Sequence, residues 1–216
     1  MKILATLAAA TVLMFASPLL RAQGPQAGPA DLDAHLAAIQ RDPRQYDASW
    51  KLGRKVAAVC ANCHGEGGNS TKPGVPNLAG QNAGYLMEQM RQFSDGRRRF
   101  EFMEGMIKAM NEDEKIGMVL FYASQPVVRQ PVERRELAAR GQQVYLGNCF
   151  LCHGDDGHGQ ATIARIAGQH PEYLVARLKR YRSPEGSRAN PQMVQRARML
   201  SESDIDAVAA YVSSMP

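Results

Sequence analysis

The pentapeptide Cys-x-x-Cys-His occurs twice in this chain of 216 residues, at residues 60–64 and 149–153, and the two copies contain all four cysteines. The spacing places two thiols and one imidazole on a single turn of chain, where all three can contact one flat macrocycle. This pattern is the attachment signature of c-type haem, in which the thiols form thioethers and the histidine becomes an axial ligand of the iron. The sequence therefore predicts two covalently bound haem c groups, attached through Cys60, Cys63, Cys149 and Cys152, with His64 and His153 as iron ligands.

Three other uses of paired cysteines fit this sequence less well. A dithiol redox motif would require a βαβ context and no adjacent histidine. A single zinc ion would have to join two cysteine pairs that are separated by 85 residues, far beyond the usual spacing. Structural disulfides suit an oxidising compartment, but a gap of two residues rarely closes without strain.

The haem motifs lie inside a longer internal repeat with an offset of 88 to 90 residues. Gly-x-x-Val precedes each motif, a polar glycine stretch follows it, and residues 78–86 match residues 166–174. Such self-similarity indicates two homologous domains of about 80 residues each. We predict an N-terminal extension at residues 23–50, domain one at 51–125, a linker at 126–136 and domain two at 137–216.

Both repeats have the periodicity of helices separated by loops, and no stretch shows convincing strand alternation. Asn111 with Glu114, and Ser201 with Asp204, predict capping boxes at the start of the last helix of each repeat. The sequence therefore predicts an all-α fold in which each haem supplies core that so small a domain otherwise lacks. The predicted helices cover residues 51–59, 83–93 and 111 onward in the first repeat, and 136–146, 171–181 and 201 onward in the second.

Each repeat also has a methionine at a matching position ahead of its last helix. Met103 and Met193 follow the histidines of their motifs by 39 and 40 residues. A methionine opposite a histidine raises the reduction potential of haem iron and suits electron transfer. We therefore predict Met103 and Met193 as axial ligands, and Met106 and Met199 as core residues. The remaining histidines, His35, His158 and His170, are predicted to be polar surface residues.

Residues 51–216 resemble the dihaem cytochrome c4 family, through the two haem motifs, the Leu-Ala-Gly-Gln-x-x-x-Tyr-Leu stretch and the spacing from methionine to last helix. The resemblance implies two tandem class I cytochrome c domains with facing haems, ligated by His64 with Met103 and by His153 with Met193. It also implies that a proline carbonyl accepts a hydrogen bond from each ligand histidine. Pro76 matches that proline in domain one, whereas domain two has Ala164, whose carbonyl can still accept the bond from a less rigid loop.

Residues 1–22 have the features of a secretory signal peptide, with a basic start, a short apolar stretch and small residues afterwards. We predict cleavage near Ala22 and a periplasmic location, with an uncleaved anchor as the alternative. Export fits the resemblance, because bacterial c-type cytochromes receive their haem outside the cytoplasmic membrane. Removing this segment lowers the net charge from +5 to +3, which is too small a positive charge to indicate nucleic-acid binding. The chain also has no basic run interleaved with aromatic residues.

Two further segments have more than one interpretation. In residues 23–50, Leu32, Leu36 and Ile39 predict one amphipathic helix, which either packs on domain one or acts as an arm that docks a partner. The run Arg97-Arg98-Arg99 is either a solvated basic face or a docking patch for an acidic partner.

Electron transport is the predicted function, because two six-coordinate irons leave no position for a substrate and no paired carboxylates or nucleophile–base arrangement stands elsewhere. The chain is therefore predicted not to be an enzyme. The resemblance implies redox protein partners, with a membrane terminal oxidase as acceptor and peripheral membrane association in some members. The alternatives are a fixed haem subunit of a dehydrogenase or oxidase complex, or a haem peroxidase or gas-binding protein with one open iron.

Overall fold

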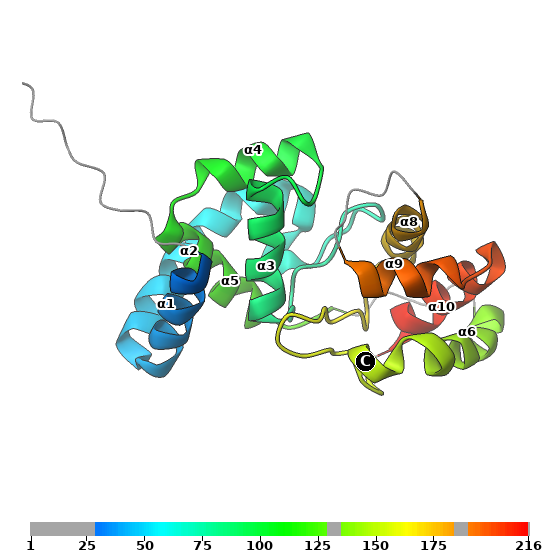
Figure 1. Cartoon of the computed structure of the whole chain (residues 1–216). Helices are drawn as coiled ribbons and strands as arrows, with labels where there is room; N and C mark the ends of the chain where they lie inside the picture. Colours follow the sequence, from blue (N-terminus) through cyan, green and yellow to red (C-terminus); the bar gives the residue numbers. More distant parts are fainter. Residues whose placement is uncertain (1–28, 129–134, 184–189, 216) are drawn as a thin grey trace, which may run out of the picture.

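The computed structural model describes residues 29–128, 135–183 and 190–215, and all regular elements in these ranges are helices. Two helical domains lie side by side (Figure 1). The first comprises α1 (Pro29–Arg41), α2 (Pro43–His64), the 3₁₀ helix η1 (Glu66–Gly68), α3 (Ala83–Ser94), α4 (Glu101–Ala109) and α5 (Glu112–Ala123). The second comprises α6 (Arg135–Asn148), α7 (Phe150–His153), α8 (Pro171–Arg182), α9 (Pro191–Arg198) and α10 (Glu202–Ser214). The predicted signal peptide lies outside the described residues.

Each domain is built on a close crossing of two helices, α2 with α5 and α6 with α10. The glycine of the repeated Gly-x-x-Val motif lies at each crossing. A Cβ atom on Gly53 would lie 1.9 Å from the carbonyl oxygen of Gly117, and one on Gly141 would lie 2.1 Å from that of Ala207. Because no side chain fits at these positions, the two glycines allow the helix that carries or precedes the haem motif to pack directly on the last helix of its domain.

The predicted helix starts of α5 and α10 are confirmed in detail. The Asn111 side-chain oxygen accepts from the Glu114 N–H, and the Glu114 carboxylate accepts from the Asn111 N–H, each at 2.9 Å. Ser201 and Asp204 form the same reciprocal pair at the start of α10. These bonds satisfy backbone donors that a helix leaves unpaired at its N-terminus. The predicted helices at 83–93 and 171–181 correspond to α3 and α8, whereas the helix predicted at 51–59 is longer and forms part of α2.

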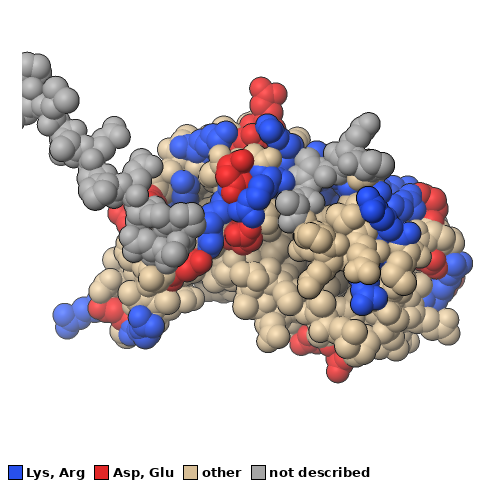
Figure 2. All heavy atoms as spheres, in the orientation of Figure 1, with Lys and Arg blue, Asp and Glu red and all other residues tan. Residues whose placement is uncertain are grey.

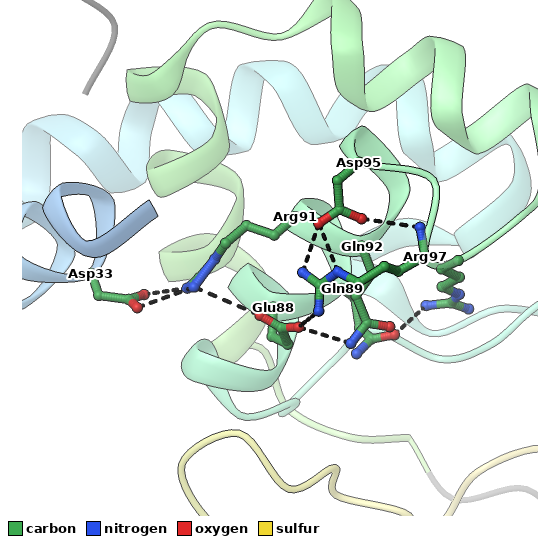
Figure 3. A network of polar contacts seen from close by, with 8 residues as sticks. Asp33, Glu88, Gln89, Arg91, Gln92, Asp95 and Arg97 are labelled. Carbon is green, nitrogen blue, oxygen red and sulfur yellow. Dashed lines mark hydrogen bonds and ion pairs between the residues drawn. The ribbon is translucent and has the colours of Figure 1, made fainter. Parts of the chain in front are cut away.

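The N-terminal extension packs on the first domain, as the first of its two interpretations predicts. Leu32, Leu36 and Ile39 of α1 are buried in the same cluster as the residues of α3 and α5. An ion pair joins Asp33 to Arg91 of α3, with 3.1 Å between Oδ2 and Nη1 (Figure 3). The described part of the extension is not one helix, because residues 43–50 already belong to α2.

Two of the three arginines at residues 97–99 contact neighbouring side chains, although Arg97 and Arg99 are exposed. Arg97 lies 3.0 Å from the Glu88 carboxylate and 2.7 Å from that of Asp95, in the polar network of Figure 3. The guanidinium of Arg98 lies over the Phe93 ring, 4.3 Å from its centroid. The charge of Arg97 is therefore matched by carboxylates of the first domain.

The loops at residues 65–82 and 154–170 lie between the two domains (Figure 1). His170 is buried in this interface, and its Nε2–H donates to the Ser70 carbonyl at 2.8 Å. The prediction that His170 is a surface residue was wrong, because the repeat alone does not reveal that this loop meets the other domain. His158 and His35 are exposed or nearly so, as predicted, and His158 lies 3.0 Å from the Asp156 carboxylate.

Candidate haem sites

Both Cys-x-x-Cys-His motifs are held on helical turns. Residues 60–64 form the last turn of α2, and residues 149–153 span the start and body of α7. A helical turn brings residues three and four positions apart onto one face, so each motif presents two thiols and an imidazole together. Gly65 (φ 76°) and Gly154 (φ 79°) follow the histidines, and their left-handed conformation turns the chain away from the helix at once. No disulfide joins any of the four cysteines, all of which lie in the described ranges.

The two motif histidines are buried and have the same hydrogen bond. His64 Nδ1 lies 2.9 Å from the Pro76 carbonyl oxygen, and His153 Nδ1 lies 2.9 Å from that of Ala164. A carbonyl can only accept, so Nδ1 carries the proton and the Nε2 lone pair of each ring is left for a metal. Burial lowers the pKa of both histidines, which favours the neutral form that a metal needs. The expectation that Ala164 replaces the family proline as acceptor is confirmed.

A cavity of about 450 Å³ lies beside the motif of the second domain. The side chains of Cys149, Cys152, His153 and Met193 all line it. Its walls are largely apolar, with Ile166, Leu174, Leu178, Leu200, Val208 and Val212 among them. Tyr85 of α3 also contributes, so the cavity reaches the interface with the first domain. An apolar cavity of this size next to two free thiols and an imidazole nitrogen fits a covalently attached macrocycle.

In the first domain the corresponding residues surround one apolar cluster. Cys60 and Met103 both pack against the buried core formed by α2, α3 and α5. Tyr122 of α5 is completely buried there, and burial raises its pKa. Cys60 and Met103 of the first domain therefore contact the same apolar cluster.

The thiols of Cys60 and Cys149 do not have the electrostatic environment of a reactive redox pair. Burial raises the pKa of the Cys60 thiol and raises that of Cys149 to about 11. Reactive redox cysteines instead need a depressed pKa, since the thiolate is the nucleophile. Within the described ranges, no group of three or more His, Cys, Asp or Glu side chains could hold a metal ion. Both alternatives to haem attachment lose support.

The two predicted methionine ligands lie on helices that the sequence analysis did not anticipate. Met103 is on α4 and Met193 is on α9. Asn190 caps α9, since its side-chain oxygen accepts from the Met193 N–H at 3.0 Å, and Pro191 follows at the first helical position. That Asn-Pro start is a helix signal that could have been recognised. Met199, predicted as a core residue, is 64% exposed, so that prediction was wrong.

Comparisons with known proteins agree with this architecture. The cytochrome c family model matches residues 50–116 and 138–216, one match in each domain. The chain is 33% identical to cytochrome c4 of Pseudomonas aeruginosa over 177 residues, which cover 76% of this chain and 87% of the relative. It is 30% identical to the thiosulfate dehydrogenase electron acceptor of Thiomonas intermedia, over 78% of this chain and 84% of that protein.

The fold is also that of a solved cytochrome c4. The crystal structure of reduced recombinant cytochrome c4 from Pseudomonas stutzeri superposes with a TM-score of 0.70 at 28% identity, covering 77% of this chain and 98% of that one. The duplicated motif, the two matched histidine–carbonyl bonds and the family match in each domain lead to one conclusion. The chain belongs to the dihaem cytochrome c4 family of electron-transfer proteins, and each of its two domains carries a covalently attached haem c.

Proposed function

We propose that this protein is a periplasmic electron carrier that shuttles between respiratory partners and delivers electrons to a membrane terminal oxidase. His64 with Met103 and His153 with Met193 would be the two axial ligand pairs. The observation that carries the proposal is the gathering of Cys149, Cys152, His153 and Met193 around one cavity, at positions that all recur in the first domain. A methionine opposite a histidine closes the iron to substrates and raises its potential.

The chain's own residues have four tasks in this function. The cysteines would attach the haem, and the histidine and methionine of each domain would hold its iron, which supplies the one-electron chemistry. The carbonyls of Pro76 and Ala164 fix the tautomer and the orientation of the imidazoles. The apolar walls exclude water, which reduces the reorganisation of the surroundings when the charge on the site changes. Closed coordination leaves the protein without a catalytic residue.

Transient docking to redox partners suits such a carrier. Basic and acidic side chains are interleaved over the upper part of the face in Figure 2, above a broad uncharged area. A small net charge with mixed surface signs favours brief encounters over a permanent complex. The name of the Thiomonas relative, an electron acceptor of a dehydrogenase, supports the view that the chain receives electrons from a separate protein. In the described part of the chain, no helix has the length and apolar character of a membrane span.

The test begins with protein isolated from the periplasm of a strain that matures cytochromes c. Mass spectrometry should give the apoprotein cleaved near Ala22 plus two haems, and an optical titration should show two reversible one-electron steps. Reduced protein should be reoxidised by respiratory membranes in a cyanide-sensitive reaction. Isolation only in a stoichiometric complex would instead favour the fixed subunit. Rapid carbon monoxide binding by the reduced protein would favour an enzyme or gas-binding protein.

A further inference from the structure

Gln81 and Gln169 hold equivalent positions in the two repeats, and each reaches across the interface to the main chain of the other domain. Gln169 Oε1 accepts from the Asn77 N–H at 2.8 Å, and its Nε2 donates to the Asn77 carbonyl at 3.1 Å. Gln81 Oε1 accepts from the Arg165 N–H at 2.7 Å, and its Nε2 donates to the Arg165 carbonyl at 2.9 Å. Asn77 and Arg165 are equivalent residues too, so the arrangement has approximate two-fold symmetry.

These contacts fall on the peptide groups that hold the motif histidines. The Asn77 N–H and the Pro76 carbonyl belong to one peptide group, and that carbonyl accepts from His64 Nδ1–H. The same holds for the peptide group between residues 164 and 165, whose carbonyl accepts from His153 Nδ1–H. Each histidine is therefore joined, through a single peptide group, to a glutamine of the opposite domain.

A chain of hydrogen bonds of this kind transmits polarisation. An acceptor on the N–H side of a peptide group strengthens the carbonyl on its other side as an acceptor. A stronger acceptor at Nδ1–H makes the imidazole a better electron donor to a metal, and this favours the oxidised metal. Gln81, Gln169 and Asn77 are buried, and Pro76, Ala164 and Arg165 are half-buried, so screening by water is limited.

We propose that Gln81 and Gln169 are positioning residues that tune the two redox sites crosswise. Gln169, in the second domain, lowers the reduction potential of the haem of the first domain by strengthening the bond to His64. Gln81, in the first domain, does the same for the second haem through His153. The proposal rests on the ligand roles proposed above for the two histidines, and it makes each potential depend on the contact between the domains.

The test uses the holoprotein with Gln169→Met or Gln81→Met, because methionine keeps the unbranched shape and removes the amide. Both reduction potentials are measured, and each haem is assigned to its domain by NMR contacts with its own thioether cysteines. Gln169→Met should raise the potential of the first haem more than that of the second. Gln81→Met should show the reverse pattern. A local packing defect would instead move the haem of the mutated domain.

Asn82 provides a matched control on the same interface. Its Nδ2 donates to the carbonyls of His158 and Ile163 at 2.8 and 2.7 Å. It does not bind the peptide groups whose carbonyls accept from His64 and His153. Asn82→Leu should therefore move the second haem less than Gln81→Met does. Amide hydrogen exchange gives a second readout, since Gln169→Met should selectively lose protection at the Asn77 N–H.

The crossed pattern decides the proposal. Shifts confined to the haem of the mutated domain, or an Asn82→Leu shift as large as that of Gln81→Met, would overturn it. If one glutamine variant does not fold, the other decides alone, because each has its own predicted target. A wild-type protein without two reversible one-electron steps would overturn the proposed electron-carrier function instead.

Discussion

Gly141 and Gly147 lie on the same helix, α6, and the same substitution should have opposite effects on them. A Cβ atom on Gly141 would lie 2.1 Å from the Ala207 carbonyl oxygen and 2.7 Å from the Tyr211 Cβ, whereas one on Gly147 would meet nothing within 4 Å. Alanine favours a helix interior over glycine by about 1 kcal/mol, and less near a helix end. Forcing a methyl group against backbone costs about 3 kcal/mol, the upper end of overpacking penalties.

We therefore expect Gly141→Ala to lower the free energy of unfolding by about 2 kcal/mol, because the overpacking outweighs the gain in helix propensity. Gly147→Ala should be neutral or stabilising by a few tenths of a kcal/mol. The assay is denaturant unfolding of the holoprotein, followed by far-UV circular dichroism and by the haem absorption of the second domain. Equal unfolding midpoints for the two variants would refute the argument that the helix crossing in this domain requires a glycine.

Three further outcomes are expected. Met103→Ala should remove the contribution of one haem from the methionine-to-iron absorption band and lower one potential, whereas Met106→Ala should leave the band intact; the opposite result would place the ligand one turn later. Ala164→Pro should raise the free energy of unfolding by about 0.5 to 1 kcal/mol, because proline restricts the unfolded chain, and a lower free energy of unfolding would show that the backbone there does not suit proline. A hydrogen bond from the Ser201 hydroxyl, assisted by a nearby arginine, holds the pKa of Asp204 below its usual value of 3.8, so its contribution is present above that value and lost as the pH falls through the folded pKa. Asp204→Asn should accordingly destabilise the protein at pH 7, but not at about pH 2, in thermal unfolding of both proteins.

The elements that the sequence predicted correctly depend on local signals. The haem motifs, the capping boxes at Asn111 and Ser201 and the apolar faces of α5 and α10 involve residues within a turn or two of one another. The internal repeat then supplied the domain count, because a motif that appears twice at a constant offset must be folded twice in the same way. The spacing of Leu32, Leu36 and Ile39 on one helical face predicted an amphipathic helix, and its packing on the first domain was one of two interpretations.

The features that the sequence did not predict depend on contacts between distant segments. The burial of His170 requires the Ser70 carbonyl, which lies a hundred residues earlier in the other domain. The bonds of Gln81 and Gln169 across the interface were equally hidden, since the repeated Ala-Gly-Gln sequence does not show which segment the glutamine amide will bind. The exposure of Met199 reflects the short helix α9, which ends one residue earlier and directs the following side chain outward.

The alanine at position 164 illustrates how the interface substitutes for a local restraint. Pro76 fixes its own φ, yet the histidine–carbonyl distance is 2.9 Å in both domains. The peptide group that follows residue 164 is bound by the first domain, since Gln81 holds both main-chain groups of residue 165. Contact with the first domain therefore restrains the loop of Ala164, whereas the proline ring restrains the loop of Pro76. The Ala164 carbonyl, which orients His153, depends more strongly on the contact between the domains than the Pro76 carbonyl, which orients His64.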